Sequence, residues 1–389
     1  MKILIAGSDL NAKLLAQYLK IEDENHDIYV TTEEKSSEKF YTCVNIKEND
    51  ILSICDFVKY NQIEFTIATS PIAIINGIAD EFKKEGFPIF APFSEAARVT
   101  YFNSIAKKIL YKLKINTPKF GIFDRENMAI DYIRRTKFPI IVENDLTLFS
   151  RENYKYDTFQ KAKVGIQKIF ENDNNKIVIE NYINGDDYYL YFITDGYNAI
   201  PLISLERKEG NNYTTIIAPS KKISEEIIIK ILQRAIYPLL DDITKYADMY
   251  VGLIGLKIKI YKDTFYVLEI YNGFQEYDLQ VFISLLKENF CKLLFDTANC
   301  CLTDNHKSIK ITNNYSYSII LNKKEIDRKQ EGSILNEDEF IIIEDKDNLI
   351  YTANALTINR AKDKLFNFLE NNISEEKLRS IIFPQEEKE

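Results

Sequence analysis

The stretch MKILIAGSDLNAKLLAQYLKIEDENHDIYV, residues 1–30, decides the fold of this chain. Its first apolar run, KILIA, ends at Gly7, a helical pattern follows from about Asn11 to Leu19, and a second apolar run covers Asp27–Val30. This order predicts a β-strand, a tight turn, an α-helix and a second β-strand. Because a helical crossover joins strands that run in the same direction, the segment predicts a parallel sheet.

The same alternation continues through the first 95 residues. Helical patterns near Asp50–Tyr60 and Ile72–Glu85 alternate with short apolar runs at Phe65–Ala68 and Pro88–Phe90. Strands and helices at this spacing predict a doubly wound, Rossmann-like parallel sheet. We assign residues 1–98 to this N-terminal α/β domain.

A second domain is expected over residues 99–302. Its first part is predicted to be a small α/β cap at about residues 119–182, built from short strands and two helices. Long antiparallel strands begin near Tyr188, with helices at about 225–246 and 279–298. A strand-rich, barrel-like third domain is expected over residues 303–389, ending in an amphipathic helix. The predicted fold class is therefore a combination of α/β and α+β.

Composition excludes several classes of protein. The 389 residues are 46% hydrophobic, with 9 Pro and 12 Gly, which excludes a disordered or collagen-like chain. Lys and Arg number 50 against 59 Asp and Glu, so nucleic acid is not expected as a partner. The five Cys lack CxxC spacing, which argues against a zinc site or a disulfide framework. Without a signal-peptide pattern or an apolar run of about 18 residues, we expect a cytoplasmic chain that makes no membrane contact.

Three segments carry a family resemblance: NGIADEFKKEGFPIFAP (76–92), VIENYINGDD (178–187) and YVLEIYNGFQEYDLQ (266–280). Together and in this order they resemble phosphoribosylamine–glycine ligase, also called glycinamide ribonucleotide synthetase, of the ATP-grasp superfamily. The segment TANALTINRAKDKLFNFLENNI (352–373) looks like the last strand and helix of that family. The resemblance implies an ATP-grasp fold with an N-terminal parallel-sheet domain and a C-terminal small barrel-like domain.

The resemblance also implies a reaction of de novo purine biosynthesis. The family joins phosphoribosylamine to glycine with ATP, by phosphorylating the glycine carboxylate and letting the amine attack the acyl phosphate. This chemistry needs cations and backbone N–H groups at the phosphates, and carboxylates that hold Mg²⁺. ATP and Mg²⁺ are therefore the implied cofactors, with glycine and phosphoribosylamine as the implied small-molecule partners.

The phosphate-binding flap departs from the family pattern. In place of a sequence like VKADGLAAGKGV, this chain has VENDLTLFSREN (142–153), which contains no glycine. The strand lysine of the family falls on Glu143, which turns an attraction of a few kcal/mol into a repulsion of similar size. Arg151 stands where the flap lysine would be and is the expected phosphate contact.

A second phosphate-contacting lysine of the family aligns with Asn103. A shift in register would bring Lys107 or Lys108 nearer, but we interpret both as solvated helix charges.

Other family positions are better preserved. We call the predicted strand at residues 178–183 the hinge strand. With Glu180 and Tyr182 it can present backbone groups to an adenine edge, and Asp187 stands where the family has its ribose-binding Glu. The alternative is a buried strand with polar ends. Glu269 and Asn272 match the implied magnesium ligands, although alternation along a strand points Asn272 away from Glu269 unless the strand breaks at Gly273.

The substrate positions are altered. Asp9 places a carboxylate at a helix N-terminus where the family binds a substrate phosphate, and we interpret it as an ordinary helix cap. The Gly-Pro-Glu turn of the family reads Thr69-Ser70-Pro71, and its glycine-rich substrate loop is reduced to residues 205–212. Two functions stay open: a strongly diverged ligase, or a catalytically inactive or repurposed homologue that binds a partner.

Overall fold

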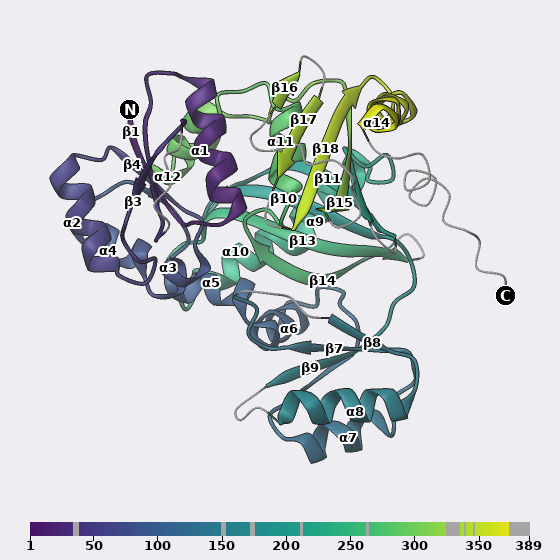
Figure 1. Ribbon diagram of the computed structural model, residues 1–389. Helices are drawn as coiled ribbons and strands as arrows, with labels where there is room; N and C mark the ends of the chain where they lie inside the picture. Colours follow the sequence, from purple (N-terminus) through teal and green to yellow (C-terminus); the bar gives the residue numbers. More distant parts are fainter. Residues whose placement is uncertain are drawn as a thin grey trace.

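The N-terminal domain is a parallel sheet with helices on both faces (Figure 1). The computed structural model describes residues 1–33, 39–148, 153–171, 176–210, 213–261, 264–323, 335–337, 340–344 and 347–372. In sheet order, the parallel strands are β3 (Thr42–Val44), β2 (Asp27–Thr31), β1 (Lys2–Ala6), β4 (Phe65–Ala68) and β5 (Ile89–Phe90). The helices of this domain are α1 (Leu10–Glu22), α2 (Ile51–Asn61), α3 (Pro71–Ile75), α4 (Ile78–Glu85) and α5 (Ser94–Tyr101).

Alternate residues of β1 enter two different cores. Ile3 and Ile5 pack in the cluster that contains α1, whereas Leu4 and Ala6 pack in the cluster that contains α2 and α4. Because successive strand residues point to opposite faces, this pattern requires a covered sheet on both sides. The predicted doubly wound sheet is confirmed, and the short edge strand β3 is an element that the sequence analysis missed.

The cap is a four-stranded antiparallel sheet covered on its outer side by two helices, at the bottom of Figure 1. Its strands, in sheet order, are β6 (Phe120–Phe123), β9 (Ile177–Asn181), β7 (Ile140–Asn144) and β8 (Asn153–Tyr156). Its helices are α7 (Glu126–Ile133) and α8 (Phe159–Phe170), and α6 (Asn103–Lys112) precedes the cap. The predicted strands and helices are present, and β8 is an additional polar strand.

The largest element is a nine-stranded antiparallel sheet. In sheet order its strands are β14 (Thr264–Asn272), β13 (Val251–Tyr261), β10 (Asp187–Asp195), β11 (Ala199–Glu209), β12 (Tyr213–Ala218), β15 (Tyr315–Asn322), β18 (Asn348–Ala355), β17 (Phe340–Glu344) and β16 (Leu335–Glu337). The C-terminal strands thus continue the central sheet through the pairing of β12 with β15. The domain boundaries at 98 and 302 stay predictions.

Helices flank this sheet on both sides of the central strands. They are α9 (Glu225–Ile231), the π-helical turn η1 (Leu232–Ile236), α10 (Tyr237–Ile243), α11 (Asp278–Leu285), α12 (Phe290–Ala298), α13 (Leu302–Asn305) and α14 (Ile358–Asn372). The single helix expected at 279–298 is two helices, because the chain leaves helical geometry at Leu286. In the described part of the chain, no helix has the length and apolarity needed to cross a membrane.

Candidate active site

The cap sheet and the central sheet face each other across a group of charged side chains, most of them almost completely buried. We call these residues the charge cluster: Lys107, Glu143, Glu180, Asp187, Lys257, Lys259 and Glu269.

Strand pairing explains why the central members of the cluster converge. Lys259 on β13 pairs with Asp187 on β10, and Lys257 pairs with Glu269 on β14. Because alternate residues of a strand point to the same face, these four side chains lie on one face of the central sheet. This face is turned toward the cap, since the Asn153 amide of β8 donates to Glu269 Oε1 at 2.9 Å.

Lys107 joins helix α6 to the cap. Its Nζ lies 2.5 Å from Glu180 Oε2 and donates to the Leu268 backbone carbonyl at 2.6 Å, and the side chain is 1% exposed. The interpretation of Lys107 as a solvated helix charge is therefore wrong, because the inward face of α6 carries it into the interior. Lys108, one residue farther, is exposed as expected.

Glu143 lies beside Glu180 on the cap sheet. Glu180 pairs with Ile141, and Glu143 is two residues farther along β7, so both carboxyl groups are on one face. Burial raises the pKa of Glu143 well above its usual range, and the carboxylates of Glu180 and Glu269 raise it further. The protonated, neutral form is favoured, so the repulsion of phosphate expected at Glu143 is reduced.

Lys257 has carboxylates on two sides. Its Nζ lies 3.2 Å from Glu269 Oε1 and 3.4 Å from Asp187 Oδ2. Burial disfavours its charge, but the neighbouring Glu269 and Asp187 carboxylates hold the pKa of Lys257 well above its ordinary value. Lys257 is therefore a fixed ammonium between two strands.

Tyr182, at the end of the hinge, lies between two ammonium groups. Lys155 Nζ is 4.4 Å from its ring centroid and Lys259 Nζ is 5.1 Å away. Contacts of this kind contribute about 0.5–1 kcal/mol at accessible sites. The Tyr182 N–H donates to the Pro139 carbonyl at 3.2 Å, so one backbone group of the hinge is already used inside the cap.

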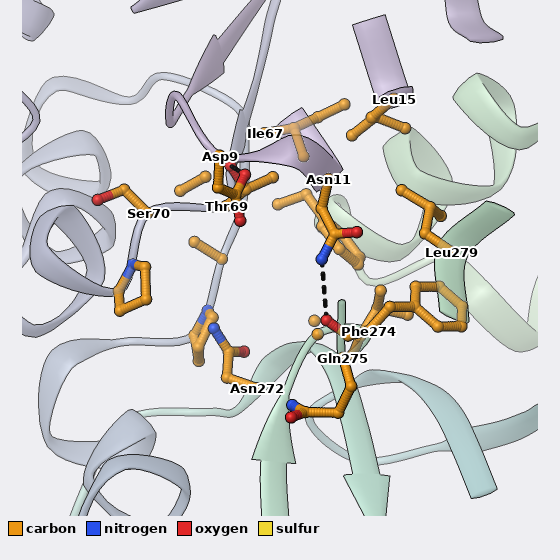
Figure 2. Close-up of a pocket in the computed structure, with 18 of the residues that line it drawn as sticks. Asp9, Asn11, Leu15, Ile67, Thr69, Ser70, Asn272, Phe274, Gln275 and Leu279 are labelled. Carbon is orange, nitrogen blue, oxygen red and sulfur yellow. Dashed lines mark hydrogen bonds between the residues drawn. The ribbon is translucent and has the colours of Figure 1, made fainter. Parts of the chain in front are cut away.

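A cavity of 630 Å³ lies between the N-terminal domain and the loop that follows β14 (Figure 2). In Figure 2, Asp9 and Asn11 come from the start of α1, and Gln275 lies across from them. The Asn11 amide donates to the Phe274 carbonyl at 3.0 Å, which links the two walls. The volume is in the usual range for a small-molecule site.

The lining of this cavity is acidic. Asp9, Glu48 and Glu276 carry carboxylates, and none of the described lining residues is Lys, Arg or His. Glu48 accepts hydrogen bonds from Ser8 at 2.6 Å and from Ser70 at 2.5 Å. A phosphate group in this cavity would meet carboxylates without a cation from the described lining.

Asp9 caps helix α1, as the sequence analysis expected. Its carboxylate accepts a hydrogen bond from the Ala12 N–H at 2.8 Å. Water reaches Asp9 through the cavity, yet desolvation by the surrounding protein raises its pKa to about 6, and Glu48 and Glu276 add to the rise. Gly7 keeps this turn tight, because a Cβ at Gly7 would lie 2.0 Å from Thr69 Oγ1.

The sequence profile of the phosphoribosylglycinamide synthetase N domain matches residues 1–100, and that of the ATP-grasp (A) domain of the same family matches residues 103–278. The chain belongs to this family. Phosphoribosylamine–glycine ligase of Caldanaerobacter subterraneus is 24% identical over 308 residues, covering 76% of this chain and 74% of the relative. The same enzyme of Clostridium acetobutylicum gives the same identity and coverage.

Solved structures share the fold of this phosphoribosylglycinamide synthetase family member. Phosphoribosylamine–glycine ligase of Thermotoga maritima superposes with a TM-score of 0.73 at 15% identity, covering 95% of this chain and 96% of the other. Biotin carboxylase of Campylobacter jejuni superposes with a TM-score of 0.71 at 13% identity, covering 96% and 91%. The predicted ATP-grasp fold is confirmed.

Some of the nucleotide contacts inferred from the family lie at the charge cluster, and others do not. Glu180 and Asp187 both belong to the charge cluster, and Tyr182 lies beside it. Arg151 lies outside the described residues, as do residues 149–152 as a whole. Asn103, aligned with a family lysine, is buried and donates to the Asn144 carbonyl at 2.8 Å, so it fastens α6 to the cap.

The two implied magnesium ligands do not face the same space. Asn272 pairs with Ile254 and contacts the hydroxyls of Tyr101 and Tyr250 at 2.6 and 2.8 Å, on the opposite face of β14 from Glu269. Their joint role as magnesium ligands therefore has no geometric support, because the strand continues to Asn272 before the turn at Gly273.

Glu269 has other partners. Oε1 accepts from Asn153 and lies beside Lys257, and Oε2 accepts from the Tyr271 hydroxyl at 2.9 Å. Among the described residues, no set of three or more His, Cys, Asp or Glu side chains has an arrangement that could hold a metal ion. Glu269 and Asn272 together thus do not fit the magnesium site that the family implies.

Lys257 and Lys259 were not singled out from the sequence, whereas Lys107 was named but expected to be solvated. Lys257 and Lys259 alternate with apolar residues in a strand that is otherwise buried, and this spacing could have identified them as inward-facing charges.

Proposed function

We propose that this chain is a strongly diverged ATP-grasp ligase of the phosphoribosylamine–glycine ligase type, acting in purine biosynthesis. Its nucleotide site is the charge cluster between the cap and the central sheet. Its candidate amine pocket is the cavity of about 630 Å³, whose acidic lining weakens the binding of a substrate phosphate. A cytoplasmic location belongs to the same proposal.

The observation that carries the proposal is the position of the cluster at the hinge. Glu180 lies near the end of β9, Tyr182 follows its last residue, and Asp187 begins the next strand, so the adenine and ribose contacts of the family have counterparts within one segment. Lys107, Lys257 and Lys259 supply positive charge beside them.

In the proposed reaction the bond between the terminal phosphorus of ATP and its bridging oxygen breaks, the phosphoryl group passes to a glycine carboxylate oxygen, and ADP leaves. The amine then attacks the acyl phosphate carbon, a C–N bond forms, the C–O bond to the phosphate breaks, and inorganic phosphate and the amine proton leave. The ammonium groups of the cluster offset the phosphate charge. No step is assigned to magnesium, because Glu269 and Asn272 face different sides of β14.

A second candidate is a catalytically inactive or repurposed homologue that binds a small molecule or a protein partner. The acidic cavity favours it. Asp9 stands where the family resemblance places a substrate phosphate, Glu48 and Glu276 line the same cavity, and the described lining offers no cation. Such a pocket disfavours phosphoribosylamine and suits a neutral or positively charged molecule.

Two measurements separate the candidates. ATP is expected to stabilise a ligase by about 2.7 kcal/mol when its concentration is about 100 times Kd, and this stabilisation appears as a higher Tm. It also releases phosphate when given phosphoribosylamine, glycine and ATP, and Glu269→Ala abolishes that release. An inactive homologue releases none.

Asp187→Asn tests the nucleotide site directly. We expect it to weaken ATP binding, whereas Asp186→Asn, which removes a carboxylate from a half-exposed pair with Lys222, leaves binding unchanged. Equal effects of the two substitutions would contradict the placement of the nucleotide.

A further inference from the structure

We propose that the ammonium of Lys257 takes the place of a divalent cation in the charge cluster, so that nucleotide binds this chain without magnesium. The proposal rests on the proposed nucleotide site and adds which group supplies its positive charge.

Glu269 is the residue that the family resemblance assigns to the metal. Both of its carboxylate oxygens already have partners, which are Asn153 and Lys257 on Oε1 and Tyr271 on Oε2. Mg²⁺ requires near-octahedral oxygen coordination at about 2.0–2.1 Å. To bind Glu269, a magnesium ion would have to displace these hydrogen bonds and approach an ammonium group.

Lys257 lies between the implied metal ligand and the implied ribose contact. Its Nζ is 3.2 Å from Glu269 Oε1 and 3.4 Å from Asp187 Oδ2. An ammonium group has three donors, so two carboxylate neighbours leave one donor, which we assign to a phosphate oxygen. The side chain keeps 17% of its surface exposed.

Three carboxylates of the cluster are already paired with lysines. Glu180, Asp187 and Glu269 each have an ammonium group within 3.4 Å, supplied by Lys107, Lys257 and Lys259. These three carboxylates are therefore neutralised by the chain itself, and a divalent cation that approached any of them would meet a cationic neighbour.

The test is the affinity for ATP, measured by titration calorimetry on the full chain in EDTA and again in excess MgCl₂. For the unaltered chain we expect the two Kd values to agree within about threefold. Lys257→Met is expected to raise Kd in EDTA at least about tenfold, and magnesium is expected to restore part of that loss.

Matched variants distinguish the loss of the Lys257 charge from a loss of folding. Lys257→Arg retains the charge and is expected to bind ATP in EDTA, while Lys222→Met removes a half-exposed lysine and is expected to change nothing. Binding of Mn²⁺ to the nucleotide-free chain, followed by electron paramagnetic resonance, gives a second readout. The unaltered chain is expected to order no Mn²⁺, and Lys257→Met is expected to gain a site at Glu269.

Two outcomes would overturn the proposal, and they differ. ATP binding that tightens tenfold or more with magnesium contradicts the role of Lys257 and leaves the proposed function standing. Absence of ATP binding in both buffers contradicts the nucleotide site itself, and the proposed function with it.

Discussion

Lys107 of helix α6 and Glu180 of strand β9 form an ion pair of 2.5 Å in which the side chains are 1% and 4% exposed. The pair connects the segment before the cap to the hinge strand of the cap. Desolvation raises the pKa of Glu180, and the charge of Lys107 opposes that rise. Ionisation of Glu180 therefore depends on its neighbour.

Removal of one partner should be strongly destabilising. Lys107→Met leaves a buried carboxylate without its cation, and we expect the free energy of unfolding in urea to fall by about 3–5 kcal/mol. Lys108→Met, on the exposed side of α6, is the control and should change it by less than about 0.5 kcal/mol. The double variant Lys107→Met/Glu180→Met should recover much of the loss, and a double variant as unstable as the single one would contradict the pairing.

Glu143 should make stability depend on pH. Its pKa is raised in the folded chain, so the folded state holds more protons than the unfolded state above about pH 4.3. The contribution of Glu143 to the free energy of unfolding is fully present below that pH, and it is lost as pH rises toward the pKa of Glu143 in the folded chain. Glu143→Gln removes this dependence, so its stability relative to the unaltered chain should increase as pH rises from about 4.3.

The measurement is urea unfolding of both chains across that range. Glu226→Gln, an exposed residue in the first turn of α9, serves as the control and should not show the trend. A constant difference between the unaltered chain and Glu143→Gln would show that Glu143 is not protonated in the folded state.

Asp9 should exclude phosphate from the cavity in a pH-dependent way. Its pKa of about 6 makes it charged at about pH 8 and mostly neutral at about pH 5. Asp9→Asn keeps a residue that caps α1 but removes the charge, so binding of ribose 5-phosphate at the higher pH should strengthen severalfold.

Nuclear magnetic resonance titration with ribose 5-phosphate gives the comparison. Asp50→Asn alters the corresponding cap of α2, which does not line the cavity, and should leave the affinity as it was. If Asp9→Asn and the unaltered chain bind equally at both values of pH, the charge of Asp9 does not control entry.

Gly7 should tolerate no side chain. A Cβ there would lie 2.0 Å from Thr69 Oγ1 and 3.0 Å from the Ser70 backbone nitrogen. We expect Gly7→Ala to destabilise the chain by about 1–3 kcal/mol in urea unfolding. Adding Thr69→Ala removes the nearer contact and should recover part of the loss. If Gly7→Ala alone has the same free energy of unfolding as the unaltered chain, the turn can move to make room for a side chain.

Much of the fold could be predicted from the sequence because short apolar runs alternate regularly with helical patterns. Residues 2–6 and 65–68 are short buried strands between helical patterns, and the predicted strands and the structure agree closely. Strand β8 was missed because Asn153–Tyr156 has no apolar alternation and pairs with β7 through the backbone. The break at Leu286 was missed because apolar residues continue on both sides of it.

The candidate site was predictable only in part. Glu180, Asp187 and Glu269 could be found from family segments, but their cationic partners lie on elements distant in sequence. Lys107 pairs with a residue 73 positions away, and its burial depends on how α6 packs under the cap rather than on its local pattern. Pattern reasoning treats a lysine on a helix as solvated, and here tertiary packing decides otherwise.

The pairing of β12 with β15 has a consequence for biosynthesis of the chain. Tyr213–Ala218, which contains Ile216 and Ile217, stays an open sheet edge until Tyr315–Asn322 has emerged from the ribosome. Open apolar edges are templates for association with other chains. The nascent polypeptide thus passes through a stage at which a chaperone that shields strand edges would improve its yield, and any truncation between the two strands would make that exposure permanent.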